Sequence, residues 1–208
     1  MDNKAIFNIG YGLYVLTARD GDIDNGCIIN TVMQVSSNPI LIAIGVSKQN
    51  LTHDMILKTK DFCISILTQD TPFEVFKHFG YQSGRTVNKF ENFENKLRNE
   101  NGIVYLSEYV NSYISCKVLE KIDFGSHTVF KAEVIDAKLL TKDETVTYSY
   151  YQKHIKPKPQ ITDKVVWRCN ICGYEYEGEN LPKDYICPIC KHGVIDFSKI
   201  TDKDEGEV

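Results

Sequence analysis

The sequence predicts a mainly β protein: a small β-barrel with a few inserted helices, followed by a short domain that a metal ion holds together. Two observations support this prediction. Over about 150 residues the chain repeats short runs of Val, Ile, Tyr and Phe that Gly, Asn and Asp interrupt, which is typical of short strands. Near the C-terminus, four cysteines form two Cys-x-x-Cys pairs within about 40 residues, too few to bury a sufficient core without a metal.

The strands are predicted where β-branched and aromatic residues cluster between turn-forming residues, at residues 11–18, 27–35, 40–46, 62–67, 113–122 and 128–140. A helix is predicted at residues 51–58, because Asn50 is a residue type that caps helix N-termini. A second helix is predicted at residues 72–79, where Pro72 follows Thr71 and suits a first helical turn. The helices are thus expected as insertions between strands of one barrel.

The chain divides into two parts that show no resemblance to each other. We assign residues 1–152 to the barrel and residues 165–201 to the metal-held domain, with an acidic tail at residues 202–208. Residues 153–164 carry Pro157 and Pro159 and few residues that could form a core. Proline fixes its own φ and biases the preceding residue toward extended geometry, so this segment is predicted to be a semi-rigid linker.

The net charge and the hydropathy of the chain argue against two classes of protein, those that bind nucleic acid and those that span a membrane. The formal net charge of −4 argues against a general nucleic-acid-binding protein, which would carry a basic surface. No apolar run approaches the roughly 20 residues of a membrane span, and the N-terminal residues lack the pattern of a signal peptide. We therefore expect a cytoplasmic protein that contacts neither membrane nor nucleic acid. In a reducing cytosol, closely paired cysteines are metal ligands more often than disulfides.

The two cysteine pairs are Cys169 with Cys172, and Cys187 with Cys190. Each pair can form a tight turn that directs two thiolates at one centre, and two such turns complete a tetrahedral cage suited to iron or zinc. Four thiolates do not discriminate between the two metals, so a structural zinc ribbon remains an alternative. The other three cysteines stand alone in apolar surroundings, and Cys63 and Cys116 are expected to be buried structural thiols.

Aromatic residues flank these cysteines, and the pattern Cys-x-x-Cys-Gly-Tyr followed by Cys-Pro-x-Cys resembles the short form of the rubredoxin family over about residues 165–200. The resemblance implies one iron that cycles between ferric and ferrous states in an apolar shell, and the aromatic shell favours iron over zinc. One position departs from the family: Gly173 follows the first pair as expected, but Lys191 stands where the family usually has Gly. A non-Gly residue with positive φ costs about 1 kcal/mol there. The flanking aromatics are Trp167, Tyr174, Tyr176, Tyr185 and Phe197.

Polar residues gather at the ends of the predicted strands of the first part, in segments 26–38, 46–54 and 83–90. The order of these motifs resembles the flavin reductase-like family from about residue 6 to residue 151. This family has a split β-barrel, binds FMN and usually forms a homodimer. The resemblance therefore implies an FMN-binding split β-barrel followed by a rubredoxin-like domain.

A phosphate group of FMN needs cations and hydrogen-bond donors, and a helix N-terminus is a natural place for it. The chain offers cations at Lys48, Arg85 and Lys89, with neutral donors beside the predicted helix start at Ser47, Asn50 and Thr52. The resemblance places Asn30, Thr31 and Gln34 along the ring and the ribityl chain, with Cys27 just before them in reach of the ring. Taken singly, each of these could be an ordinary polar residue at a strand end.

The segment Gly-Ser-His-Thr-Val-Phe at residues 125–130 resembles the family's histidine-containing strand start, where a histidine lies beside the flavin and can contact nicotinamide. His127 is therefore the candidate for the hydride-transfer pocket. The alternative is a surface histidine in a turn.

The two resemblances together predict an electron relay. NAD(P)H gives two electrons as hydride and a rubredoxin iron accepts one at a time, so a flavin between them links the two steps. The tandem resembles rubredoxin fusions of anaerobes that donate NADH electrons to flavodiiron proteins, which reduce dioxygen or nitric oxide. The alternatives are a flavin reductase that releases reduced flavin, or a flavin-binding module, each with a structural zinc ribbon. No Gly-rich nucleotide turn is present to choose between NADH and NADPH.

Overall fold

The computed structural model of the chain describes residues 3–157, 165–171, 174–187 and 192–200. The chain forms two compact units, Met1–Lys156 and Pro157–Val208. The division lies inside the predicted linker, whose first residues belong to a π-helical turn, Tyr151–Ile155. Residues 158–164 of that linker and the acidic tail at residues 202–208 lie outside the described residues.

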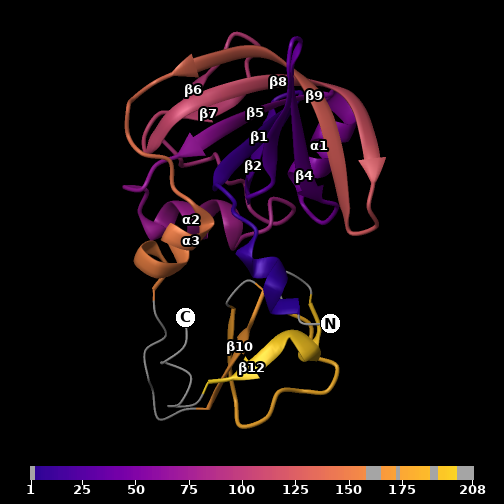
Figure 1. Cartoon of the computed structure of the whole chain (residues 1–208), viewed down its shortest axis with the longest axis vertical. Helices are drawn as coiled ribbons and strands as arrows, with labels where there is room; N and C mark the ends of the chain where they lie inside the picture. The colour runs from indigo at the N-terminus through magenta and orange to yellow at the C-terminus, as the bar shows by residue number, and fades with distance from the viewer. Residues whose placement is uncertain (1–2, 158–164, 172–173, 188–191, 201–208) are drawn as a thin grey trace. The chain divides into compact units, whose positions relative to one another are not determined.

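The first unit is built on a seven-stranded sheet with the strand order β2-β1-β5-β8-β9-β4-β3, in which every neighbouring pair is antiparallel. Figure 1 shows the long strands β8 and β9 arching over the shorter ones. The bounds are β1 Tyr14–Asp20, β2 Ile23–Ile29, β3 Val32–Ser37, β4 Ile40–Ser47, β5 Asp61–Leu67, β8 Val110–Asp123 and β9 His127–Leu139.

The sheet curls into a barrel because its two edge strands are consecutive in the chain. β2 and β3 stand at opposite ends of the strand order, yet only Asn30 and Thr31 separate them. The three residue steps from Ile29 to Val32 span at most about 11 Å, so the two edges must approach each other at this corner. The backbone N–H of Gly45 in β4 donates to the Thr31 carbonyl at 3.1 Å, which fastens the corner. The predicted mainly β barrel is confirmed.

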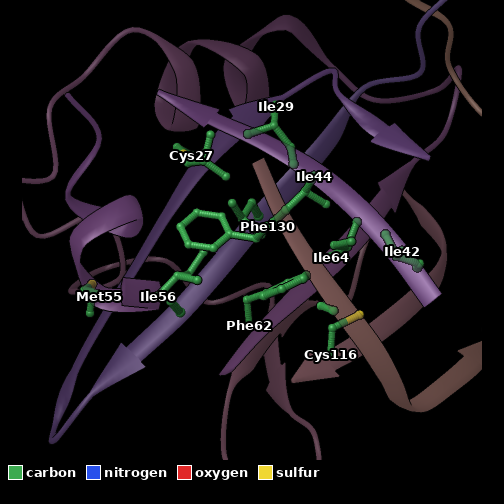
Figure 2. Packing of buried hydrophobic residues seen from close by; sticks show 14 residues of the cluster. Cys27, Ile29, Ile42, Ile44, Met55, Ile56, Phe62, Ile64, Cys116 and Phe130 are labelled. Atoms are coloured by element: carbon green, nitrogen blue, oxygen red, sulfur yellow. The ribbon is translucent and has the colours of Figure 1, made fainter. Parts of the chain in front are cut away.

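The interior of the barrel is one apolar cluster with contributions from β1, β2, β4, β5, β8, β9 and α1. Figure 2 shows Phe130 of β9 lying between Cys27 of β2 and Ile56 of α1. Phe130 is fully buried, and burial of such a side chain contributes about 2–3 kcal/mol. Cys63 and Cys116 are also fully buried, as predicted.

Most predicted strands are confirmed to within a few residues at their ends, but residues 27–35 are not a single strand. The chain leaves β2 after Ile29 and enters β3 at Val32, so the prediction was wrong at this point. No Gly or Pro marks the break, and the two polar residues Asn30 and Thr31 between apolar runs gave only a weak turn signal. The sequence also did not predict the short hairpin β6–β7, formed by Lys96–Arg98 and Val104–Leu106.

The two predicted helices are present. α1, Leu51–Thr59, starts after Asn50, whose side chain makes no capping hydrogen bond, and it ends at Lys60 with φ of 67°. α2, Phe73–Gly80, starts one residue later than expected, so Pro72 is the residue before the helix. A short helix α3, Tyr148–Tyr150, follows β9.

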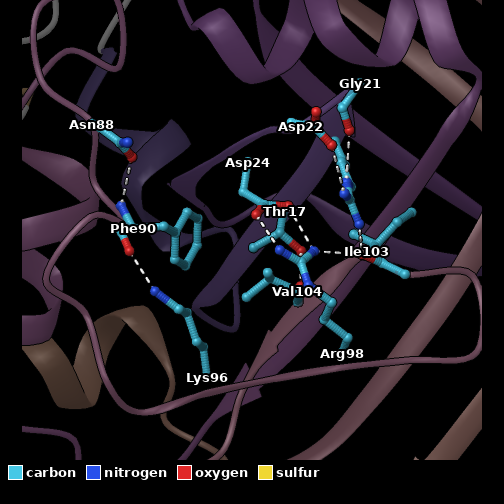
Figure 3. Close-up of polar contacts among 12 residues, drawn as sticks. Thr17, Gly21, Asp22, Asp24, Asn88, Phe90, Lys96, Arg98, Ile103 and Val104 are labelled. Atoms are coloured by element: carbon cyan, nitrogen blue, oxygen red, sulfur yellow. Dashed lines mark hydrogen bonds and ion pairs between the residues drawn. The ribbon is translucent and has the colours of Figure 1, made fainter.

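The loop between α2 and β6 and the β6–β7 hairpin are tied to the barrel by polar contacts (Figure 3). Arg98 pairs with Asp24 of β2 at 2.6 Å, and the Thr17 hydroxyl of β1 donates to the Val104 carbonyl. Lys96 donates to the Phe90 carbonyl. These contacts fix the segment that brings Arg85 toward α1.

The second unit contains a three-stranded sheet in the order β11-β10-β12. Its strands are Glu175–Glu177 (β11), Val166–Cys169 (β10) and Phe197–Lys199 (β12), and a 3-10 turn at Val194–Asp196 precedes β12. Cys169 and Cys187 are buried with Phe197, and Trp167, Tyr174 and Tyr185 pack against them. The predicted aromatic shell therefore surrounds both described cysteines.

Candidate functional site

The end of β4, the start of α1 and the start of β9 meet at one place in the first unit. Ser47, the last residue of β4, pairs with His127, the first residue of β9. The Lys48 N–H donates to the Ser126 carbonyl at 3.0 Å, and the Asn50 N–H donates to the Ser47 carbonyl at 3.1 Å. The structure thus brings together Ser47, Lys48, Asn50 and His127, which the sequence predicted as parts of one site.

Lys48 is held by an acidic partner that the sequence did not reveal. Its Nζ lies 2.7 Å from Oδ1 and 2.6 Å from Oδ2 of Asp123, at the end of β8. The Gly125 N–H donates to Asp123 Oδ1 at 2.8 Å. The hydrogen bond from Lys48 and then that from Gly125 hold the pKa of the Asp123 carboxyl below its usual value, so it is ionised at neutral pH.

Arg85 reaches the same helix start from the loop after α2. Its Nε donates to the Gln49 carbonyl at 3.3 Å, and its Nη2 donates to Oδ2 of Asp54 at 2.6 Å. Oδ1 of Asp54 lies 2.9 Å from Nδ1 of His53. The hydrogen bonds from His53 and from Arg85 lower the pKa of Asp54.

The buried His53 links α1 to the start of β9. Its Nε2 lies 2.9 Å from the Thr128 hydroxyl, next to His127 in the chain. Because an ionised carboxylate only accepts, Nδ1 carries a proton, and in the neutral imidazole Nε2 then accepts from Thr128. The sequence patterns did not indicate His53, Asp54 or Asp123 as site residues. The one available signal was the acidic residue in the first turn of α1.

Thr52 and Cys27 lie beneath the site. The Thr52 hydroxyl is fully buried and accepts from Asn25 Nδ2 at 2.8 Å. Cys27 is 4% exposed, and burial raises the pKa of its thiol, against the opposing effects of Thr52 and Lys89. Both side chains are therefore buried, whereas the sequence predicted Thr52 as a neutral donor to the phosphate and Cys27 within reach of the ring.

The charged group of Lys89 does not lie with those of Lys48 and Arg85 at the start of α1. It is 2% exposed, and its Nζ donates to the carbonyls of Gly26 and Phe79, both at 2.9 Å. Burial lowers the pKa of Lys89. Its assignment as a phosphate-binding cation is corrected accordingly: Lys89 ties the loop after α2 to β2 and to the end of α2. Burial could not be read from the sequence, where Lys89 and Arg85 look alike.

Asn30 and Thr31 form the β2–β3 corner, where the Thr31 hydroxyl donates to Asn30 Oδ1 at 3.0 Å. The Thr31 side chain packs on Gly45, since a Cβ on Gly45 would lie 3.1 Å from Thr31 Cγ2. Gly45 precedes Ser47 by two residues, which places the corner close to the helix start.

Gln34 lies farther along the sheet. It pairs with Ile42 of β4, about 17 Å from Ser47 at the usual strand rise, and its Nε2 donates to the Ser36 carbonyl at 3.1 Å. The predicted residues therefore follow an elongated path, with the charged groups at one end and Gln34 at the other.

The described cysteines of the second unit sit at the start of two similar loops. The Cys169 N–H donates to the Tyr174 carbonyl, and the Cys187 N–H donates to the His192 carbonyl, each across five residues and at 2.8 Å. Cys172 and Cys190 would lie within these loops but fall outside the described residues, as do Gly173 and Lys191. The described part alone contains no group of three or more His, Cys, Asp or Glu side chains placed to hold a metal. The two matching hydrogen bonds fit two pairs of thiolate ligands.

Comparison with protein families gives a match for each unit. The flavin reductase like domain matches residues 6–158, and the rubrerythrin, rubredoxin-like domain matches residues 167–198. The chain belongs to the flavin reductase-like family. It is a flavoprotein oxidoreductase that carries a C-terminal rubredoxin-like domain, as the two resemblances implied. FMN and iron, the predicted cofactors, agree with these two domains.

Three named proteins are similar to this chain in sequence. It is 36% identical to the high molecular weight rubredoxin of Moorella thermoacetica, over 96% of this chain and 100% of that protein. It is 34% identical to the ferric-chelate reductase (NAD(P)H) of Archaeoglobus fulgidus, over 79% of this chain and 97% of that one. A protein of Nostoc sp. named "Putative diflavin flavoprotein A 5" is 26% identical over 71% of this chain but only 25% of its own length.

A solved structure shows the same fold. The NADH:FAD oxidoreductase SgcE6 of Streptomyces globisporus superposes with a TM-score of 0.62 at 22% identity, over 72% of this chain and 90% of that chain. Within the described residues, no helix has the length and apolar character needed to cross a membrane.

Proposed function

We propose that the protein oxidises NAD(P)H by hydride transfer to FMN and passes single electrons through a four-cysteine iron centre to a protein acceptor. The supporting observation is that both domains occur in one chain that aligns over 96% of its length with a high molecular weight rubredoxin. FMN, when bound, supplies the step that divides a hydride into two single electrons. The residues of this chain bind, orient and shield the reacting groups.

In this proposal, the FMN phosphate binds at the N-terminus of α1. Ser47, Lys48, Asn50 and Arg85 lie around this helix start, and the Asn50 side chain makes no hydrogen bond that would cap it. Helix N-termini attract anions through free N–H groups and the helix dipole. Asn30 and Thr31 at the β2–β3 corner and Gln34 on β3 would contact the ribityl chain and the ring.

His127 would orient the nicotinamide. It stands at the start of β9 beside Ser47, and its Nδ1 lies 2.9 Å from the Ser126 hydroxyl. This contact restrains the imidazole, and the buried His53–Thr128 contact anchors the next residue of the strand. Hydride transfer requires close approach of donor and acceptor with water excluded, so the work of these side chains is positional.

Cys169, Cys172, Cys187 and Cys190 would hold the iron. The aromatic residues packed on Cys169 and Cys187 keep water from the sulfurs, and such a shell tunes the reduction potential of a thiolate-bound iron. The outgoing electron would then reach a protein of the flavodiiron type. This part of the proposal is supported by the diflavin flavoprotein relatives, in which a similar segment forms about a quarter of a longer chain.

We also place the protein in the cytoplasm and expect a homodimer. The outer part of the β8–β9 hairpin exposes Leu119, Ile122 and Phe124, and the corner strand β3 exposes Met33 and Val35. A two-stranded arm with exposed apolar side chains gains stability when a second surface covers it. Light scattering on the purified protein tests this, and a monomeric mass would contradict it.

A substitution in the iron site tests the relay. In Cys187→Ser, NAD(P)H should still bleach the FMN absorbance in a stopped-flow experiment, whereas reduction of a one-electron protein acceptor should be lost. Wild-type protein should show ferric thiolate absorption together with a flavin spectrum. An acceptor reduced equally well by Cys187→Ser would exclude the relay and favour direct reduction by the flavin domain. The ferric-chelate reductase relative, which aligns with 79% of this chain, motivates that second candidate.

A further inference from the structure

The two cations at the start of α1 are neutralised by carboxylates of the protein itself. Lys48 pairs with Asp123 and Arg85 pairs with Asp54, each at 2.6 Å. The two ion pairs together carry no net charge. A phosphate that binds at this site therefore competes with these carboxylates for the two cations.

The two carboxylates are held differently. Asp54 uses one oxygen for Arg85 and the other for His53, which is itself buried and bound to Thr128. Releasing Asp54 would disturb a buried contact. The Asp123 side chain is 68% exposed, and besides Lys48 it accepts a hydrogen bond from the Gly125 N–H of its own turn. Asp123 can therefore leave Lys48 at low cost.

A phosphate is the stronger partner for Lys48. It carries more charge than a carboxylate, and it can accept hydrogen bonds from Lys48 and from the N–H groups of the α1 start at the same time. Asp123 offers only its carboxylate, which also accepts from the Gly125 N–H. The same lysine thus faces two competing anions.

We infer that Asp123 is a placeholder for the flavin phosphate: it holds Lys48 when no flavin is bound, and the phosphate displaces it. This inference rests on the proposed function, in which FMN binds at this helix start. Asp123 then weakens FMN binding. It also connects flavin occupancy to the turn before His127, because the Lys48 N–H donates to the Ser126 carbonyl of that turn.

Asp123→Asn is the variant that isolates the charge. The Asn side-chain oxygen can still accept from the Gly125 N–H, while the negative charge next to Lys48 is removed. Flavin-depleted protein is titrated with FMN and with riboflavin, which lacks the phosphate, and binding is followed by flavin fluorescence. We expect the Kd for FMN to fall about threefold at low salt, the size of effect that an exposed ion pair produces, and to fall less at high salt. The Kd for riboflavin should not change.

Asp20→Asn is the matched control. It breaks the ion pair between Asp20 and Lys58, which also measures 2.6 Å but involves the last turn of α1. It should leave both dissociation constants unchanged. An FMN affinity that is unchanged or weaker in Asp123→Asn, or an equal change for riboflavin, would overturn the placeholder role alone. Wild-type protein that binds no FMN would overturn the proposed function and the placeholder with it.

Discussion

Replacing Lys89 by Met tests whether this lysine stabilises the fold or binds the flavin phosphate. The substitution keeps the length of the side chain but removes the donor to the carbonyls of Gly26 and Phe79. A buried carbonyl that loses its partner costs about 1–3 kcal/mol, so two give about 2–6 kcal/mol. The penalty for burying the ammonium group disappears at the same time, which brings the expected loss of unfolding free energy to about 2–4 kcal/mol.

Lys48→Met provides the contrast. The Lys48–Asp123 pair is exposed, so its loss should leave the free energy of unfolding nearly unchanged. The same substitution removes a charged donor from the phosphate, so the Kd for FMN should rise about tenfold or more. For Lys89→Met, the Kd of the folded protein should stay within about twofold of wild type.

Two measurements on each variant decide the matter: urea unfolding followed by circular dichroism, and fluorescence titration with FMN under conditions in which both variants are folded. The reasoning is refuted if Lys89→Met is as stable as wild type and binds FMN as weakly as Lys48→Met. Lys89 would then be a phosphate ligand, and the buried geometry would not represent its role.

Two further outcomes are expected. Phe130→Ala removes the ring from the centre of the barrel and should lower the free energy of unfolding by about 3–5 kcal/mol, whereas Ile135→Ala on the same strand, which is 43% exposed, should cost far less; equal losses in urea unfolding would contradict the proposed core. The folded-state pKa of Asp54 is lowered, so its contribution is fully present above about pH 4 and is lost as the pH falls through that folded-state pKa. The stability difference between wild type and Asp54→Asn should therefore shrink on acidification, and a difference that grows would show that the carboxylate is not stabilised by His53 and Arg85.

The strands, α1 and the cysteine pairs could be predicted because each has a local signal. Residues 40–46 and 62–67 are dense in β-branched residues, and Asn50 marks a helix start. The approach of Ser47 to His127 was available only through the family resemblance, since it depends on the pairing of β4 with β9. Sequence patterns do not specify which strands become neighbours across many intervening residues.

The errors have physical causes that lie outside local sequence. The break at Asn30–Thr31 comes from closing the barrel, a property of the whole sheet. Lys89 was misassigned because burial decides whether a lysine serves a ligand or the fold, and burial follows from tertiary packing. Asp123 was missed because its partner, Lys48, lies 75 residues away in the chain.

The two-residue corner between β2 and β3 also bears on how the protein resists unfolding. At this corner the chain itself connects the two edge strands of the barrel. How far these strands can separate therefore depends on the conformations of Asn30 and Thr31 and on the contact of Thr31 with Gly45. A flavin lying against Gln34 of β3 at one end and Ser47 of β4 at the other would act as a cross-brace between β3 and β4, next to this corner. Loading with cofactor should then slow proteolysis at the corner, which makes the cofactor a fastener of the barrel as well as a carrier of electrons.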